Sequence, residues 1–172
     1  MSLSALDDKV ATDAAHLALH HHLFIPARGG DPRTLVLLHG TGGTETSFLS
    51  IGDPITADAA KLSLRGPVDE NGMARFFRRR GEGVYDMDDL KRRTAELALF
   101  LAAAFQRYGR DPARAIGVGY SNGANILANL AFTEPSALGG YALMHPLIPF
   151  DPAPQPALRG VPVLITSGAR DP

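Results

Sequence analysis

Short apolar runs alternate with helix-like segments along most of the chain. The runs at 34–40 and 161–168 are continuous and apolar, which is typical of strands covered on both faces. Other stretches show weaker strand patterns, including 16–27, where apolar residues recur at strand spacing. The ranges predicted as strands are 16–27, 34–40, 59–67, 114–121, 139–146 and 161–168.

Two segments between these runs carry helical patterns. The segment 87–109 is the longest, with Asp86 or Asp88 as its cap and Gly109 after its end. The segment 122–135 directly follows a predicted strand and is stopped by Pro135. Alternating strands and helices predict an α/β fold with a mostly parallel sheet and helices on both faces. No repeat divides the sequence, so residues 1–172 are expected to form a single domain.

Three stretches lack clear periodicity and are predicted to be loops on a rigid sheet, where functional sites usually form. They are 41–58, 65–86 and the proline-rich 145–160. In the second, Phe76 and Phe77 either line an apolar substrate pocket or anchor the segment. Four of its five arginines, at positions 75, 78, 79 and 80, are expected to be solvated rather than to attract an acidic substrate.

Composition narrows the function classes. The 172 residues are 45% hydrophobic and 20% charged, with a net charge of −1, so neither a nucleic-acid nor a membrane partner is indicated. The absence of cysteine excludes disulfides, thiolate metal sites and cysteine nucleophiles. The N-terminus lacks the pattern of a signal peptide, and the longest apolar run, 97–105, is too short to span a bilayer. We therefore expect a cytoplasmic protein.

A serine between two glycines marks the candidate nucleophile. Gly119, Ser121 and Gly123 fit the pattern G-x-S-x-G between a predicted strand and a predicted helix. Such a turn projects the serine hydroxyl above the sheet, and the following helix N-terminus favours negative charge there. A tight turn of small residues is the plain alternative. A dinucleotide-binding loop fits poorly, because Asn122 stands where the third glycine of G-x-G-x-x-G belongs.

A second glycine-rich stretch, "LLHGTGGT" at 37–44, supplies a candidate oxyanion hole. It follows a buried strand, where an α/β-hydrolase places one oxyanion donor, so the backbone N–H groups of Thr41 and Asn122 are predicted to bind the oxyanion. No lysine follows the glycines, which excludes a phosphate loop. His39 is predicted to hold this loop rather than to act as a base. Asp171, after the last predicted strand, stands where the catalytic acid belongs.

Four strings in this order resemble the phospholipase/carboxylesterase family of small α/β-hydrolases, and more narrowly bacterial esterases linked to hydroquinone resistance. They are "LHGTGG", "LRGPVDENGMARFFRRRGEGVYD", "GYSNGAN" and "VLITSGARDP". The resemblance implies a cofactor-free serine esterase acting on a small-molecule ester, with Ser121 as nucleophile and Asp171 as acid. A thioesterase, or a non-catalytic ligand-binding protein on the same scaffold, remains an alternative. A homodimer is left open.

The histidines depart from the family pattern. Members carry a Gly-His pair after the acid, whereas all six histidines of this sequence precede Asp171. The sequence is therefore expected to be truncated before the last strand and helix of the fold, without its catalytic histidine. His145 follows a strand and is expected to border the substrate pocket. The run 20–22 is expected to line a strand surface rather than to bind metal, because no carboxylate cluster accompanies it.

Overall fold

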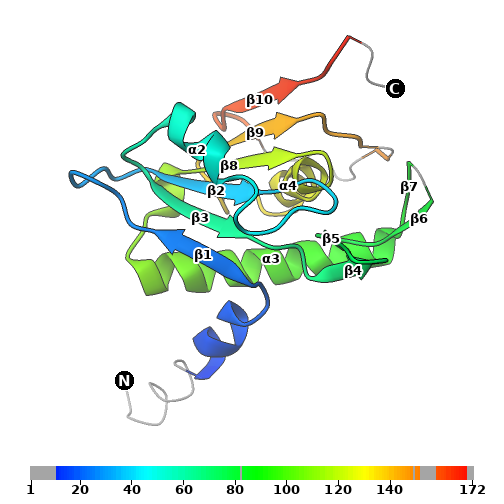
Figure 1. Ribbon diagram of the computed structural model, residues 1–172, viewed down its shortest axis with the longest axis horizontal. Coiled ribbons are helices and arrows are strands. Elements are labelled where there is room, and N and C mark those ends of the chain that lie inside the picture. Colours follow the sequence, from blue (N-terminus) through cyan, green and yellow to red (C-terminus); the bar gives the residue numbers. More distant parts are fainter. Residues whose placement is uncertain (1–10, 82, 149, 152–157, 170–172) are drawn as a thin grey trace.

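The computed structural model describes residues 11–81, 83–148, 150–151 and 158–169, and these residues build a six-stranded sheet with helices on both faces (Figure 1). The strand order is β1-β3-β2-β8-β9-β10. Only β1 runs antiparallel to its neighbour within this sheet, which confirms the predicted mostly parallel α/β architecture. The sheet strands are β1 (His22–Ile25), β2 (Thr34–Leu38), β3 (Ala60–Leu64), β8 (Ala115–Tyr120), β9 (Gly140–Met144) and β10 (Val163–Thr166).

The two faces of the sheet can be read from the side-chain alternation of β2. Val36 and Leu38 point into the larger core, which the helices α3 (Met87–Tyr108) and α4 (Asn122–Thr133) cover. Leu35 and Leu37 point to the opposite face, where the region around α2 (Leu49–Ile55) packs. Because β2 is buried on both faces, its sequence is continuously apolar, as the run at 34–40 indicates.

The long helix has the ends that its sequence predicts. Asp86 is the N-cap of α3, and its side chain accepts a hydrogen bond from the backbone N–H of Asp89. Gly109 adopts the left-handed conformation at the C-terminus, with φ of 60°. No helix in the described ranges has the length and apolar character needed to cross a bilayer.

Three local predictions need correction. Residues 16 and 17, the first two of the predicted strand at 16–27, belong to a helical stretch at 11–17, and within that predicted range only His22–Ile25 forms a strand. The predicted loop at 41–58 contains α2. The predicted loop at 65–86 contains two small antiparallel hairpins, which are too short to show periodicity. These hairpins pair β4 (Val68–Glu70) with β5 (Met73–Arg75) and β6 (Arg79–Gly81) with β7 (Val84–Tyr85).

Strand β10 lies at the edge of the sheet (Figure 1). Its apolar side chains are largely exposed, with Leu164 at 60% and Ile165 at 62%. An apolar groove of about 400 Å³ runs beside it, over β8 and β9, toward Ile55 of α2. The continuous apolar pattern at 161–168 thus forms a strand, but in the described chain that strand is covered much less than β2.

Candidate active site

The candidate residues gather where the parallel strands end. Thr41 follows β2, Ser121 follows β8 and His145 follows β9, and these three strands are neighbours in the sheet. In open α/β sheets, ligands bind at the carboxyl ends of the strands, because the loops there can vary while the sheet stays fixed. Asp171, the predicted acid, lies outside the described residues.

Ser121 occupies a strained turn between strand and helix. Its φ of 49° and ψ of −113° lie in a region that L-residues rarely adopt. The turn is held by its neighbours, since the Ser121 N–H donates to the Met144 carbonyl at 2.9 Å and the Ser121 carbonyl accepts from the Asn125 N–H at 2.9 Å. Such strain costs on the order of 1–3 kcal/mol and persists only where the surroundings fix it, which is common at active sites.

The two glycines of the motif are required by close backbone contacts. A Cβ on Gly119 would lie 2.7 Å from the Ala124 nitrogen, inside the first turn of α4. A Cβ on Gly123 would lie 2.4 Å from the Leu38 carbonyl oxygen and 2.6 Å from that of His39. The amino end of α4 therefore lies directly against the end of β2. This contact brings the Asn122 backbone close to the loop that carries Thr41.

Some backbone N–H groups of the glycine-rich loop at 40–43 donate hydrogen bonds within the protein, and others do not. The Gly42 N–H donates to the Ala74 carbonyl at 2.9 Å, and the Gly43 N–H donates to the Gly40 carbonyl at 3.1 Å. Within the described ranges the Thr41 N–H makes no hydrogen bond, and neither does the Asn122 N–H at the start of α4. Both predicted oxyanion donors thus keep a free hydrogen at the carboxyl edge of the sheet.

His39 holds the loop, as the sequence predicts. Its Nε2 accepts from the Gly66 N–H at 3.0 Å, so the proton is on Nδ1, which donates to the Gly40 carbonyl at 2.6 Å. The residue is 1% exposed, and burial lowers its pKa. With both ring nitrogens engaged, His39 has no nitrogen left to accept a proton from Ser121.

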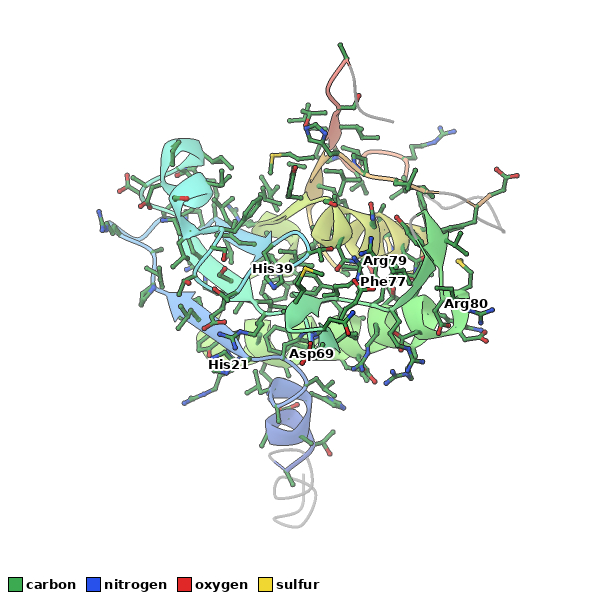
Figure 2. The ribbon with its side chains drawn as sticks, turned by 45° about the vertical axis from the view of Figure 1, so that its right-hand side comes forward. His21, His39, Asp69, Phe77, Arg79 and Arg80 are labelled. Atoms are coloured by element: carbon green, nitrogen blue, oxygen red, sulfur yellow. The ribbon has the colours of Figure 1, made fainter. Side chains whose placement is uncertain are left out.

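The segment 65–86 packs against the strand–serine–helix turn at residues 119–123, which we call the elbow. Phe76 and Phe77 are fully buried in the larger core, and the Phe76 N–H donates to the Asn122 Oδ1 at 2.6 Å. The rings therefore anchor the segment, one of the two roles predicted for them, while a substrate-lining role stays a prediction. Figure 2 shows Phe77 within the body of the molecule and Arg80 at its periphery.

The expectation that the arginines at positions 75, 78, 79 and 80 are solvated is wrong for one of them. Arg75 is only 4% exposed and donates from Nη1 to the Thr41 Oγ1 at 2.6 Å. Arg78 and Arg80 are well exposed. Strand β5 is only three residues long, which is too short for a periodic pattern to indicate this burial.

A second polar network connects the segment to the loop after β9. The Tyr85 hydroxyl donates to the Leu147 carbonyl at 2.7 Å and accepts from the Asn125 Nδ2 at 2.6 Å, and burial raises the pKa of Tyr85 to about 12. The Asn125 Oδ1 accepts from the Leu147 N–H at 2.7 Å. Nearby, the His145 ring packs edge-on against Tyr120, the residue before the serine. Its place at the pocket border stays a prediction.

The histidine run lies apart from these residues. His20 is 2% exposed, which corrects the expectation that the whole run lines a strand surface, and burial lowers its pKa to about 4. The His22 Nε2 is hydrogen-bonded to the Tyr108 hydroxyl at 2.8 Å, and the His21 Nε2 lies 3.5 Å from Glu45. Within the described part of the chain, no three histidine, aspartate or glutamate residues are grouped to hold a metal ion.

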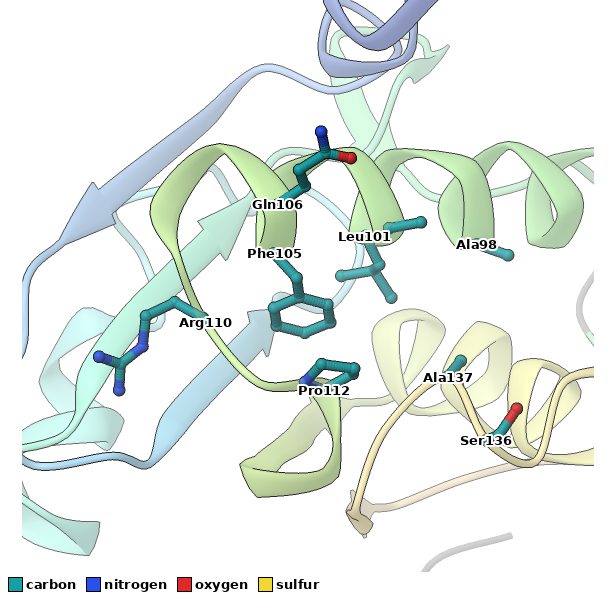
Figure 3. Close-up of a pocket in the computed structure, with 9 residues that line it drawn as sticks. Ala98, Leu101, Phe105, Gln106, Arg110, Pro112, Ser136 and Ala137 are labelled. Atoms are coloured by element: carbon teal, nitrogen blue, oxygen red, sulfur yellow. The ribbon is translucent and has the colours of Figure 1, made fainter. Parts of the chain in front are cut away.

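A pocket of about 360 Å³ lies away from Ser121, between α3 and the loops around Pro112 and Ser136 (Figure 3). It opens at the amino ends of the strands, since Pro112 precedes β8 and Arg110 donates to the Thr34 Oγ1 at the start of β2. Ser121 follows the opposite end of β8. This pocket is therefore separate from the candidate active site.

Comparison with known proteins supports the reading of the fold. No family model matches the sequence. A protein of Bacillus subtilis (strain 168) named "Putative hydrolase MhqD" is 47% identical over 145 residues, which cover 84% of this chain and 72% of that protein. The carboxylesterase of Bacillus cereus has 41% identity and a TM-score of 0.87, over 93% of this chain and 76% of that one.

A third comparison agrees with these two. A carboxylesterase from Mesorhizobium loti is 29% identical with a TM-score of 0.83, over 88% of this chain and 72% of its own. The sequence relative is similar over most of its length, and the two solved structures have the same overall fold over most of this chain. The chain therefore belongs to the phospholipase/carboxylesterase family of α/β-hydrolases.

Proposed function

We propose that the chain is a serine carboxylesterase that cleaves a small-molecule ester through an acyl-enzyme. The single observation that carries the proposal is the backbone of Ser121, which is held at φ 49° and ψ −113° between β8 and α4. Backbone strain that is fixed by close contacts is common at active sites, and at a turn of this type it presents the serine hydroxyl to the substrate. The carboxylesterase structures among its relatives agree with this reaction class.

In the proposed mechanism, the Ser121 Oγ attacks the ester carbonyl carbon and loses its proton to a base. The carbonyl oxygen becomes an oxyanion, which accepts hydrogen bonds from the Thr41 and Asn122 N–H groups. The leaving alcohol takes the proton as the tetrahedral intermediate collapses to the acyl-enzyme. Water then attacks the acyl carbonyl with the same base, releasing the carboxylic acid and restoring the serine.

The proposed acid is Asp171, which orients the base, and the proposed base is a histidine outside the six in this sequence. His39 is unsuited because both its ring nitrogens are engaged. The His20 ring is hydrogen-bonded to the Arg65 carbonyl, and the His22 ring is hydrogen-bonded to the His20 carbonyl and the Tyr108 hydroxyl, rather than to the serine turn. His145, beside Tyr120, is the alternative base to be tested.

A fluorophosphonate probe tests the nucleophile. We expect covalent labelling of Ser121 and none in Ser121→Ala, whose kcat on a p-nitrophenyl ester should fall by about 10⁴–10⁶ in a chain that contains the base. A pre-steady-state burst of nitrophenol would show the acyl-enzyme. Equal labelling of the Ser121→Ala variant would refute the proposal and favour a ligand-binding role for the scaffold.

The base is tested by comparing two chains. The 172-residue chain is expected to have little esterase activity, and a chain extended by the native segment predicted to follow Pro172 is expected to recover it. Asp171→Asn in the extended chain should lower kcat by about 10³–10⁴. If the 172-residue chain is fully active and His145→Ala abolishes that activity, His145 is the base.

A further inference from the structure

We propose that Arg75 is a positioning residue for the oxyanion hole, because its guanidinium fixes the turn that carries the Thr41 amide. The inference rests on the proposed function, since an oxyanion donor has a role only if Ser121 attacks a carbonyl. It goes beyond that function by assigning a task to the segment 73–77, which contains neither the nucleophile nor a donor.

The contacts of Arg75 are those of a built site rather than of a surface charge. Its Nη1 donates to the Thr41 Oγ1 at 2.6 Å, and its Nε donates to the Phe77 carbonyl at 3.2 Å. The Glu70 Oε2 lies 3.7 Å from Nη1. A buried guanidinium is costly unless its donors are paired, and neither lysine nor a neutral residue could make the same planar set of contacts.

The turn that Arg75 contacts needs support from outside. Thr41 stands between Gly40 and Gly42, and Gly42 has a φ of +83°. Two glycines give this peptide wide conformational freedom, so its orientation must be fixed by tertiary contacts. Two hydrogen bonds with residues of β5 fix it. Arg75 donates one to the Thr41 hydroxyl, and the Ala74 carbonyl accepts the other from the Gly42 N–H at 2.9 Å.

The same segment also contacts the second donor. The next residue, Phe76, donates from its backbone N–H to the Asn122 Oδ1 at 2.6 Å, and its ring is fully buried. Residues 73–77 thus contact Thr41 through Arg75 and Asn122 through Phe76. One rigid segment therefore sets the separation of the two N–H groups that the proposed mechanism aims at one oxyanion. Displacing either donor by about 1 Å is enough to cost on the order of 10²-fold in rate.

The sharpest test removes the Thr41 hydroxyl, which accepts the hydrogen bond from Arg75, and leaves the backbone N–H of residue 41 in place. In the extended chain, Thr41→Val should lower kcat by about 10- to 100-fold, because a loosened donor loses part of the 10²–10³-fold effect of one oxyanion contact. KM should change little, since the oxyanion forms only after binding. Thr41→Ser retains the hydroxyl and should keep most of the activity. Arg75→Met should match Thr41→Val.

Two further readouts separate positioning from simple loss of structure. Affinity for a trifluoromethyl ketone, which forms a tetrahedral adduct with the serine, should fall by the same factor as kcat in Thr41→Val and Arg75→Met. Amide hydrogen exchange in the 172-residue chain should accelerate at residues 40–43 in both variants. Arg79→Met is the matched control, because Arg79 also pairs with Glu70, at 3.0 Å, but makes no contact with Thr41 in the described structure; it should behave as wild type.

The outcomes are distinct. The double variant of Arg75→Met and Thr41→Val should lose no more activity than the more impaired single variant, because both remove the same hydrogen bond. Two outcomes would overturn the role of Arg75 and leave the proposed function standing. One is that Thr41→Val leaves Ser121-dependent turnover unaffected. The other is that the losses of the two single variants multiply in the double variant. A wild-type extended chain without Ser121-dependent turnover would overturn the proposed function and this inference together.

Discussion

Gly123→Ala sets two effects of opposite sign against each other at the elbow. Gly123 is the second residue of α4, where alanine ordinarily stabilises a helix by about 0.5–1 kcal/mol. The added Cβ, however, would lie 2.4 Å and 2.6 Å from the carbonyl oxygens of Leu38 and His39. Carbon–oxygen contacts are ordinarily a full ångström longer, and both neighbours are backbone atoms that cannot rotate away.

The overlap has to be relieved by moving the amino end of α4 away from β2. Overpacking of this kind costs typically about 1–3 kcal/mol, which exceeds the helix-propensity gain. We therefore expect a net loss in the free energy of unfolding of up to about 2 kcal/mol. The larger effect should be on activity, because the movement displaces Ser121 and the Asn122 N–H together, and a shift of about 1 Å costs on the order of 10²-fold.

Urea unfolding and the rate of fluorophosphonate labelling measure the two effects separately. Gly81→Ala is the matched control, since a Cβ there would meet no atom within 4 Å; its stability should stay within about 0.5 kcal/mol of wild type. A Gly123→Ala variant that is as stable as wild type and is labelled at the same rate would show that the close approach of α4 to β2 does not require glycine.

Three further predictions concern stability. Because burial lowers the folded-state pKa of His20 to about 4, below the unfolded value of 6.5, the unfolded chain binds the proton more readily, and about 3 kcal/mol should be lost as pH falls from about 6.5 to 4. His20→Phe should flatten the pH dependence of urea unfolding in that window, and an unchanged profile would contradict the assignment. Tyr85→Phe leaves the Leu147 carbonyl and the Asn125 amide without their partner, so calorimetry should show a loss of about 1–3 kcal/mol. Leu164→Lys, on the exposed edge strand, should change the stability of the 172-residue chain by less than about 0.5 kcal/mol while reducing self-association in sedimentation experiments; a large destabilisation would mean that β10 is covered in solution.

Much of the fold could be predicted because long elements carry their own signals. The helix α3 has a capping aspartate, a periodic apolar face and a terminal glycine, all within one continuous stretch. Strand β2 is apolar at all four positions after Thr34 because both its faces are buried. The helix α2 and the hairpins of residues 65–86 were missed, since short elements are stabilised by what they pack against and not by local pattern.

The candidate site divides in the same way. Ser121 and its two glycines are recognisable from sequence because the turn imposes steric demands on adjacent residues, and the structure shows the contacts that impose them. His39 could be assigned a structural role from its place before the acid in chain order. The signal for the serine turn is thus local to the end of one strand, and that for His39 rests on chain order.

Arg75 could not be recognised in the same way. In the sequence it is one of four arginines within six positions, with nothing to separate it from its exposed neighbours. Only the tertiary structure brings it beneath Thr41, 34 residues earlier, and brings the Phe76 N–H to Asn122, 46 residues later. The sequence by itself determined the long elements and the serine turn, because these depend on neighbouring residues. Which charged side chain is buried was decided by the folded chain, since burial and pairing of a charge depend on groups distant in sequence.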